Sequence, residues 1–276
     1  MSGRALPPTA PAHHAELRRA ALHELAALLA AKGVCHSHGI DHARAVAAHA
    51  CRATAELGPR LTPDEAAAVE LAAVLHDADD RKFWPENADH ENARAVLRAA
   101  GRPDLEPLVV EMISYVSASA NRSEIPPACV AAPWKLLPRH CDRLEAFGWV
   151  GYLRCLEYTH TVGRPLWTPE TARAADEADL WARVAAPARY AAYRGNSVSM
   201  VDHYYDKLLH FTAAYRADVA CLDAEAELRR RVIVDVCLAF GRDGALDAEA
   251  LAARAEKEAA AEACRAGAWP PGLEPL

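Results

Sequence analysis

The chain has 276 residues, 52% of them apolar, and a formal net charge of -7, so it can bury a large core and carries no excess of basic residues. This charge balance argues against a long nucleic acid as a partner, and no stretch reaches the roughly 18 uninterrupted apolar residues of a membrane helix. The eight cysteines include no CxxC pair, which is typical of free thiols in a reducing compartment. We therefore expect a soluble, cytoplasmic protein with no membrane partner.

Abundant alanine, sparse glycine and apolar residues at three- and four-residue spacing predict an all-α fold. Residues 1–12, rich in Pro and Ala, are predicted to be disordered. Residues 13–217 should form a helical core, and residues 218–276 a helical C-terminal extension packed on that core, ending in a flexible tail. The short loops favour one compact unit.

The first helices can be placed by their end signals. A helix is predicted to begin near Asp41, its expected N-cap, which places His42 in the first turn. Another opens at Thr62, the N-cap before a proline, and ends at the pair His76-Asp77. Further helices are expected at about residues 15–31, 88–100, 104–117, 134–158, 170–186, 198–217, 220–240 and 247–265.

Three polar residues on helices that lie far apart in the sequence predict a buried site. His42, His76 and Asp142 each share a helix face with apolar residues three or four positions away, so all three side chains should point inward. Buried carboxylates such as Asp77 and Asp142 need a cation or tight hydrogen bonds. Two imidazoles and two carboxylates suit one divalent ion among Mn, Mg, Co, Ni, Fe and Zn, with Mn favoured.

These residues resemble the signature of the HD-domain superfamily of metal-dependent phosphohydrolases, which is a His, then an adjacent His-Asp pair, then a distant Asp. The match here is His42, His76-Asp77 and Asp142. The resemblance implies an HD-domain helical bundle with additional C-terminal helices, in which these four residues hold the metal.

Three further stretches resemble a bacterial subgroup of that superfamily, which cleaves nucleoside triphosphates to monophosphate and pyrophosphate. They are residues 76–83 (HDADDRKF), 113–115 (ISY) and 202–209 (DHYYDKLL), and the resemblance covers about residues 14–240. The subgroup commonly has Asp-Ala-Asp and Arg-Leu-Asp where this chain has residues 140–145 (HCDRLE), so the neighbours of the metal-binding Asp differ. The implied substrate is a small-molecule nucleotide.

The resemblance also implies roles for residues around the metal. Asp77 is the candidate for both metal ligand and proton acceptor, because a metal would lower the pKa of a water beside it. Lys82 matches the subgroup motif and is the expected catalytic contact to the substrate phosphate. Asp80 would orient a water or Lys82, although an acid beside two basic residues is also a common surface arrangement.

Three other basic residues are secondary candidates for substrate binding. Arg81 lies in the same loop as Lys82 but does not match the motif, and Arg143 and Lys207 rank below it. His90 and His140 could serve a second metal, but the chain between residues 78 and 141 offers no well-placed pair of further ligands. We therefore expect one metal.

Several alternatives stay open at this point. A 5′-nucleotidase, or another phosphomonoesterase or phosphodiesterase, would use the same metal and base. A guanosine tetraphosphate hydrolase is less favoured, because Asp80-Arg81 stands where those enzymes carry Glu-Asp. More distant alternatives are a di-iron oxygenase of the same superfamily and a helical binding protein without catalysis. The sequence leaves the oligomeric state open, and a homodimer is compatible with it.

Overall fold

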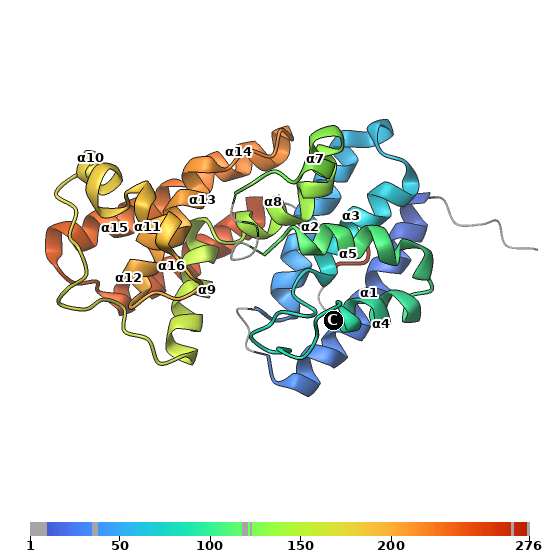
Figure 1. Cartoon of the computed structure of the whole chain (residues 1–276), viewed down its shortest axis with the longest axis horizontal. Coiled ribbons are helices and arrows are strands. Elements are labelled where there is room, and N and C mark those ends of the chain that lie inside the picture. The colour runs from blue at the N-terminus through green and yellow to red at the C-terminus, as the bar shows by residue number, and fades with distance from the viewer. Residues whose placement is uncertain (1–9, 35–37, 118–120, 122, 266–267, 275–276) are drawn as a thin grey trace, which may run out of the picture.

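A computed structural model of the chain describes residues 10–34, 38–117, 121, 123–265 and 268–274. Over these residues the protein is all-α, as predicted, with no strand, and its helices form two halves (Figure 1). Of the segment predicted to be disordered, residues 1–9 lie outside the described residues, whereas residues 10–12 belong to the first helix. Within the described part of the chain, no helix is both long and apolar enough to cross a membrane.

The N-terminal half is built around one helix that is buried on all sides. Its elements are α1 (Ala10–Lys32), α2 (Ile40–Leu57), η2 (Gly58–Arg60), α3 (Pro63–Leu75), α4 (Glu91–Ala99), η3 (Pro103–Leu105), α5 (Glu106–Ser114), α7 (Pro127–Ala131), η4 (Pro133–Leu136) and α8 (Leu137–Leu144). The central helix is α3, which packs against α1, α2, α5 and α8. Every residue from Ala67 to Leu75 is buried, as expected for a helix that is apolar around its whole circumference.

The C-terminal half contains shorter helices and two π-helical turns, η5 and η6. Its elements are α9 (Gly148–Thr161), α10 (Glu177–Asp179), η5 (Leu180–Val184), α11 (Pro187–Ala192), α12 (Met200–His203), η6 (Tyr204–Leu208), α13 (Leu209–Ala214), α14 (Ala220–Arg229), α15 (Arg231–Asp243) and α16 (Ala248–Arg265). Helix α9 packs against α15 and α16, and α14 reaches across to α2 and α8 (Figure 1). The halves therefore meet along α8, α9 and α14.

The predicted N-cap of α3 is confirmed, and that of α2 is wrong. Thr62 Oγ1 accepts a hydrogen bond from the Glu65 amide (3.2 Å), and the Glu65 carboxylate accepts one from the Thr62 amide (2.7 Å), which completes a capping box. Helix α2 instead begins at Ile40, with Gly39 at the N-cap and no side-chain cap. Asp41 lies inside the first turn, where it pairs with Arg44 at 2.5 Å.

One long helix over residues 134–158 is predicted, but the structure divides this segment at residues 145–147. Gly148 has φ +69°, and a Cβ there would lie 2.7 Å from a carboxylate oxygen of Glu262. A Cβ at Gly151 would lie 2.3 Å from the Ala146 carbonyl carbon. Two glycines therefore allow the chain to turn sharply between α8 and α9, where a continuous helix would keep these groups apart.

Two other predicted helices are also interrupted. The segment expected as a helix over residues 170–186 is helical only in α10 and η5, and the one expected over 220–240 divides into α14 and α15 at Arg230. At the C-terminus, the part of the predicted flexible tail that is described lies against α1. Leu273 is buried there, and Arg18 donates a hydrogen bond to the Pro271 carbonyl.

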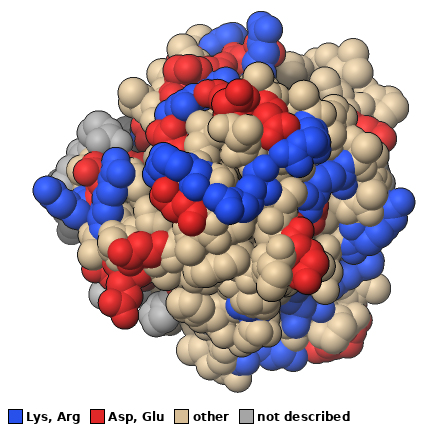
Figure 2. Space-filling model, turned by 90° about the vertical axis from the view of Figure 1, so that its left-hand side faces the viewer, with Lys and Arg blue, Asp and Glu red and all other residues tan. Residues whose placement is uncertain are grey.

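Basic and acidic side chains lie together on the end face of the C-terminal half. Figure 2 shows Lys and Arg side chains in a band across this face, with Asp and Glu side chains beside them. Several arginines of this half form ion pairs: Arg183 with Asp179 (2.5 Å), Arg231 with Glu177 (2.6 Å) and Arg242 with Asp243 (2.8 Å). These pairs offset much of the positive charge.

Candidate metal centre

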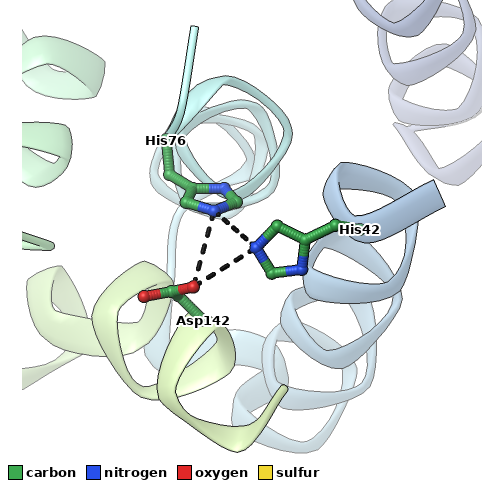
Figure 3. A group of neighbouring side chains, drawn as sticks. All are labelled: His42, His76 and Asp142. Atoms are coloured by element: carbon green, nitrogen blue, oxygen red, sulfur yellow. Dashed lines mark hydrogen bonds and ion pairs between the residues drawn. The ribbon is translucent and has the colours of Figure 1, made fainter. Parts of the chain in front are cut away.

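Three helices bring two histidines and one aspartate to a common point (Figure 3). His42 comes from the first turn of α2, His76 is the C-cap of α3, and Asp142 lies on α8. Their ligand atoms are close: His42 Nε2 lies 3.1 Å from His76 Nε2 and 3.3 Å from Asp142 Oδ1, and His76 Nε2 lies 3.6 Å from Asp142 Oδ1. This group can hold a metal ion.

Asp77 joins the same cluster from the residue that follows His76. Its Oδ2 lies 3.3 Å from His76 Nε2 and 3.8 Å from His42 Nε2. The structure thus brings all four predicted ligands together, although they are spread over about a hundred residues of sequence.

Burial and hydrogen bonding orient the two rings. The side chains of His42 and His76 are 2% and 0% exposed, whereas those of Asp77 and Asp142 are 26% and 29% exposed. The cluster therefore opens to solvent on its carboxylate side. His76 Nδ1 donates a hydrogen bond to the Ala73 carbonyl (2.8 Å), which leaves Nε2 to face the other ligands.

The pKa values of the cluster show mutual stabilisation of opposite charges. Burial alone would lower the pKa of His76, but the carboxylates of Asp77 and Asp142 outweigh it and raise this pKa to about 9. Burial would raise the pKa of Asp142, but His42 and His76 bring it down to about 2, and His76 holds that of Asp77 well below its usual range. Two ionised carboxylates beside two imidazole nitrogens are a donor set that fits a divalent cation.

Lys82 lies directly beside the metal ligands, in a second polar group. Its Nζ is 3.0 Å from His38 Nε2 and 3.4 Å from Asp80 Oδ2, and its backbone amide donates to Asp80 Oδ1 (2.9 Å). Ligand atoms of His38, Asp77 and Asp80 lie within 4.8 Å of one another. Asp80 therefore contacts both the backbone and the side chain of Lys82, and the orienting role predicted for it stays a prediction.

The secondary basic candidates lie in different surroundings. Arg81 is exposed. Arg143 and Lys207 lie against one aromatic ring, with the guanidinium carbon of Arg143 4.5 Å and Lys207 Nζ 5.5 Å from the ring centre of Phe211. Arg143 directly follows the ligand Asp142, so this pair of cations borders the metal centre.

The two histidines considered for a second metal lie elsewhere. His90 is the N-cap of α4, with a left-handed φ of 56°, and the His140 ring packs against Tyr215 with ring centres 5.5 Å apart. Neither belongs to a group of potential metal ligands among the described residues. The expectation of a single metal remains a prediction.

Three residues at the centre were not singled out in the sequence. His38 precedes His42 by four residues, a spacing that would place both on one helix face, although His38 lies before the helix begins. The ring of Tyr158 on α9 contacts the His38 ring (5.3 Å between centres) and lies under Lys82 Nζ (5.1 Å). Arg154, one turn earlier on α9, lowers the pKa of His42, after the larger effect of burial, to about 4. No signal in the sequence alone connects α9 to the metal.

A buried ionic network supports the centre from behind, and sequence reasoning also missed it. Glu145, one turn after Asp142, accepts from His49 Nε2 (2.7 Å) and from Arg229 Nη1 (3.0 Å). Arg52 donates to His49 Nδ1, so the neutral His49 ring carries its proton on Nε2. The network joins α2, the end of α8 and α14. The only sequence feature that pointed to this network is Glu145 itself, because residues 143–145 read Arg-Leu-Glu where the resembled subgroup commonly has Arg-Leu-Asp.

Comparisons with known proteins find a relative in sequence and solved structures of similar fold. No protein-family model matches the chain. The uncharacterized protein L803 of Acanthamoeba polyphaga mimivirus is 35% identical over 190 residues, and the match covers 63% of this chain and 74% of that protein. A crystal structure of a structural-genomics target from Lactobacillus plantarum superposes with a TM-score of 0.60 at 21% identity, over 82% of this chain and 96% of that one, and shows a shared fold. By the identity and coverage of the first match, this chain belongs to the same protein family as the uncharacterized mimivirus protein.

Proposed function

We propose that this protein is a metal-dependent phosphohydrolase of the HD-domain superfamily, which hydrolyses nucleoside or deoxynucleoside triphosphates to monophosphate and pyrophosphate. The observation that carries the proposal is the convergence of His42, His76, Asp77 and Asp142, at 3.1–3.8 Å, beside the ammonium of Lys82. A site with two imidazoles, two carboxylates and an adjacent cation suits a divalent metal, which would displace the proton of His76, and a phosphorylated substrate.

The four ligands would hold one divalent ion, with Mn favoured. When bound, such an ion supplies positive charge to the attacked phosphate and increases the acidity of a nearby water. Asp77 is partly exposed and ionised at neutral pH, as a proton acceptor must be. It would accept a hydrogen bond from the attacking water and hold that water toward phosphorus.

Lys82 would neutralise charge that develops on the phosphoryl oxygens. Its ammonium is held by His38 and Asp80 and lies over the Tyr158 ring, so it is positioned before the substrate binds. Asp80 is a positioning residue in this scheme, because its carboxylate accepts a hydrogen bond from the Lys82 backbone amide and pairs with the Lys82 ammonium.

The test is a screen of nucleotides with several divalent metals. We expect release of pyrophosphate from triphosphates with wild-type protein, and loss of turnover in His76→Ala and Asp77→Ala. His23→Ala, an exposed histidine on α1, is the matched control and should keep full activity. Release of orthophosphate from monophosphates would favour a 5′-nucleotidase instead. Unchanged turnover in the two ligand variants would refute the mechanism.

One observation favours a second candidate with two metals. The group of His38, Asp77 and Asp80 shares Asp77 with the first site, which is the arrangement a di-iron oxygenase would need. The Lys82 ammonium already lies among these three residues, so a cation is present there without a second metal. Metal analysis of the purified protein separates the cases, since we expect one ion per chain, and two irons would favour the oxygenase. Tight nucleotide binding without turnover in any metal would favour a binding protein.

A further inference from the structure

Lys207 is a largely buried lysine that forms no ion pair among the described residues, and the acidic side chain whose charge acts on it is Asp142, one of the candidate metal ligands. Lys207 lies on η6 over the Phe211 ring. The acids nearest in sequence are engaged elsewhere: Asp206 accepts from Arg189 Nε (2.7 Å), and Asp202 accepts from Arg189 Nη2 (2.9 Å). An ammonium removed from water without a counter-charge destabilises the folded state unless an anion joins it.

A second cation shares the same ring. The Arg143 guanidinium carbon lies 4.5 Å from the Phe211 ring centre, and Arg143 is covalently next to the metal-ligand candidate Asp142. Phe211 therefore holds two positive groups together at the border of the metal centre. Cation–π contact allows this, because the face of the ring is negative and attracts both groups.

Lys82 faces these groups from the N-terminal half of the molecule. Burial, and after it the charge of Lys82, lower the pKa of Lys207 to about 8. Burial, followed by Lys207, Arg164 and Lys82, holds the pKa of the His203 imidazole well below its usual range. Positive charge from both halves is thus concentrated beside the candidate metal centre.

We propose that Lys82, Lys207 and Arg143 form a binding site for a chain of linked phosphates, with Lys82 on the phosphate attacked at the metal centre and Lys207 with Arg143 on the phosphates beyond it. The inference rests on the proposed function and deepens it, because these outer phosphates would be the leaving pyrophosphate. In this scheme an isolated phosphate at the metal centre would contact Lys82, and two or more linked phosphates would contact cations of both halves.

The experiment is calorimetric titration of orthophosphate, pyrophosphate and tripolyphosphate into the full chain, with one equivalent of Mn²⁺ and separately in EDTA. We expect wild-type affinity to rise at least about tenfold from orthophosphate to tripolyphosphate, by the added charge-assisted contacts. Lys207→Met should lower tripolyphosphate affinity about tenfold or more, while the affinities for orthophosphate and Mn²⁺ change less than about threefold. An equal loss for all three anions, or no loss, would overturn the proposal.

Control variants separate charge, folding and catalysis. Lys207→Arg keeps the charge and should keep most of the tripolyphosphate affinity, and Lys257→Met, at an exposed lysine of α16, should behave as wild type. The melting temperature of ligand-free Lys207→Met should equal or exceed that of wild type, because the substitution removes an unpaired buried charge.

Failure of this inference can be distinguished from failure of the proposed function. If no nucleotide is hydrolysed, but binding affinity still depends on phosphate chain length and on Lys207, only the proposed function is refuted. If triphosphates are hydrolysed, but Lys207→Met changes neither KM nor inhibition by pyrophosphate, only the proposed binding site for linked phosphates is refuted.

Discussion

The two halves of the molecule bring opposite chemistry to one place. The N-terminal half contributes electron-pair donors, from His42, His76, Asp77 and Asp142, on and around α3, which is buried from Ala67 to Leu75. The C-terminal half contributes a cation, Lys207, on a π-helical turn, and the aromatic rings that support other cations. A metal ion needs fixed, converging lone pairs, whereas an anion can be held by flexible side chains. Under the proposed function, the first half would hold the metal, and the second would add a cation and aromatic rings to the binding of the substrate.

The joint between the halves carries its own buried charges. Glu145 stands at the end of the ligand helix α8 and is tied to α2 through His49 and to α14 through Arg229. Metal ligands and substrate cations can act together only if this joint fixes the two halves. Substitutions in one half, in the joint, or at the contact between the metal centre and the substrate therefore disturb different parts of this arrangement.

The largest effect is expected from a change in the metal-binding half. Asp77→Asn keeps the shape of the side chain but removes its charge and its ability to accept a proton. We expect kcat/KM for the best triphosphate to fall at least about 1,000-fold, which is about 4 kcal/mol of transition-state stabilisation. Steady-state kinetics with metal analysis checks this, and circular dichroism should show an unchanged helical content. Activity near the wild-type value would remove Asp77 from the mechanism.

The next effect concerns the joint. Arg229→Met leaves the buried Glu145 carboxylate with His49 as its partner. We expect the free energy of unfolding to fall by about 3 kcal/mol, because removing one partner of a buried ion pair leaves the other charge buried without compensation. Arg230→Met is the matched control, because Arg230 is 38% exposed and pairs with Glu227 on the surface. Arg230→Met should lower the free energy of unfolding by less than about 1 kcal/mol. Equal midpoints in urea for the two variants would contradict a structural role for the network.

The contact between metal centre and substrate gives a smaller expected effect. Lys82→Met should lower kcat/KM for triphosphates roughly 100-fold, as expected for the loss of one group that stabilises developing charge. Lys32→Met is the control, because Lys32 is also a lysine in a surface ion pair but lies with Glu86, away from the ligands. A parallel loss of Mn²⁺ affinity in Lys82→Met would indicate that Lys82 supports the metal ligands instead of the substrate.

The clustering of the four candidate ligands could be predicted from sequence, but their surroundings could not. His42 and His76 each lie on a helix face that can be identified from the apolar spacing within that one helix. The structure buries both faces. The sharp turn before Gly148 depends on close approaches to Ala146 and to Glu262, which no local pattern encodes. The sharing of Phe211 by Arg143 and Lys207 is likewise a contact between residues more than sixty positions apart. Helical periodicity reports which side of a helix is inside, but not which distant helix lies against it.

The joint also predicts a small dependence of stability on pH. Burial lowers the pKa of His49, and the opposing effect of Glu145 does not restore it, so the ring is neutral in the folded protein. In the unfolded chain it takes up a proton near its ordinary pKa of about 6.5. The unfolded state therefore binds more protons as pH falls below that value, and this residue makes stability decrease by at most about 1.4 kcal/mol per pH unit. Above about pH 7, His49 is neutral in both states and makes no contribution to the change of stability with pH.

Replacement of His49 by Gln tests this sign. Gln can still donate to Glu145 but cannot titrate, so His49→Gln should be less stable than wild type by about 1 kcal/mol at pH 7.5 for an imperfect hydrogen bond. Urea unfolding from pH 7.5 to 5.5 should then show a shallower loss of stability in the variant, and the two curves should converge as pH falls. If the slopes are equal, His49 is protonated in the folded state, and the Glu145 network is a fully ionic bridge between the halves.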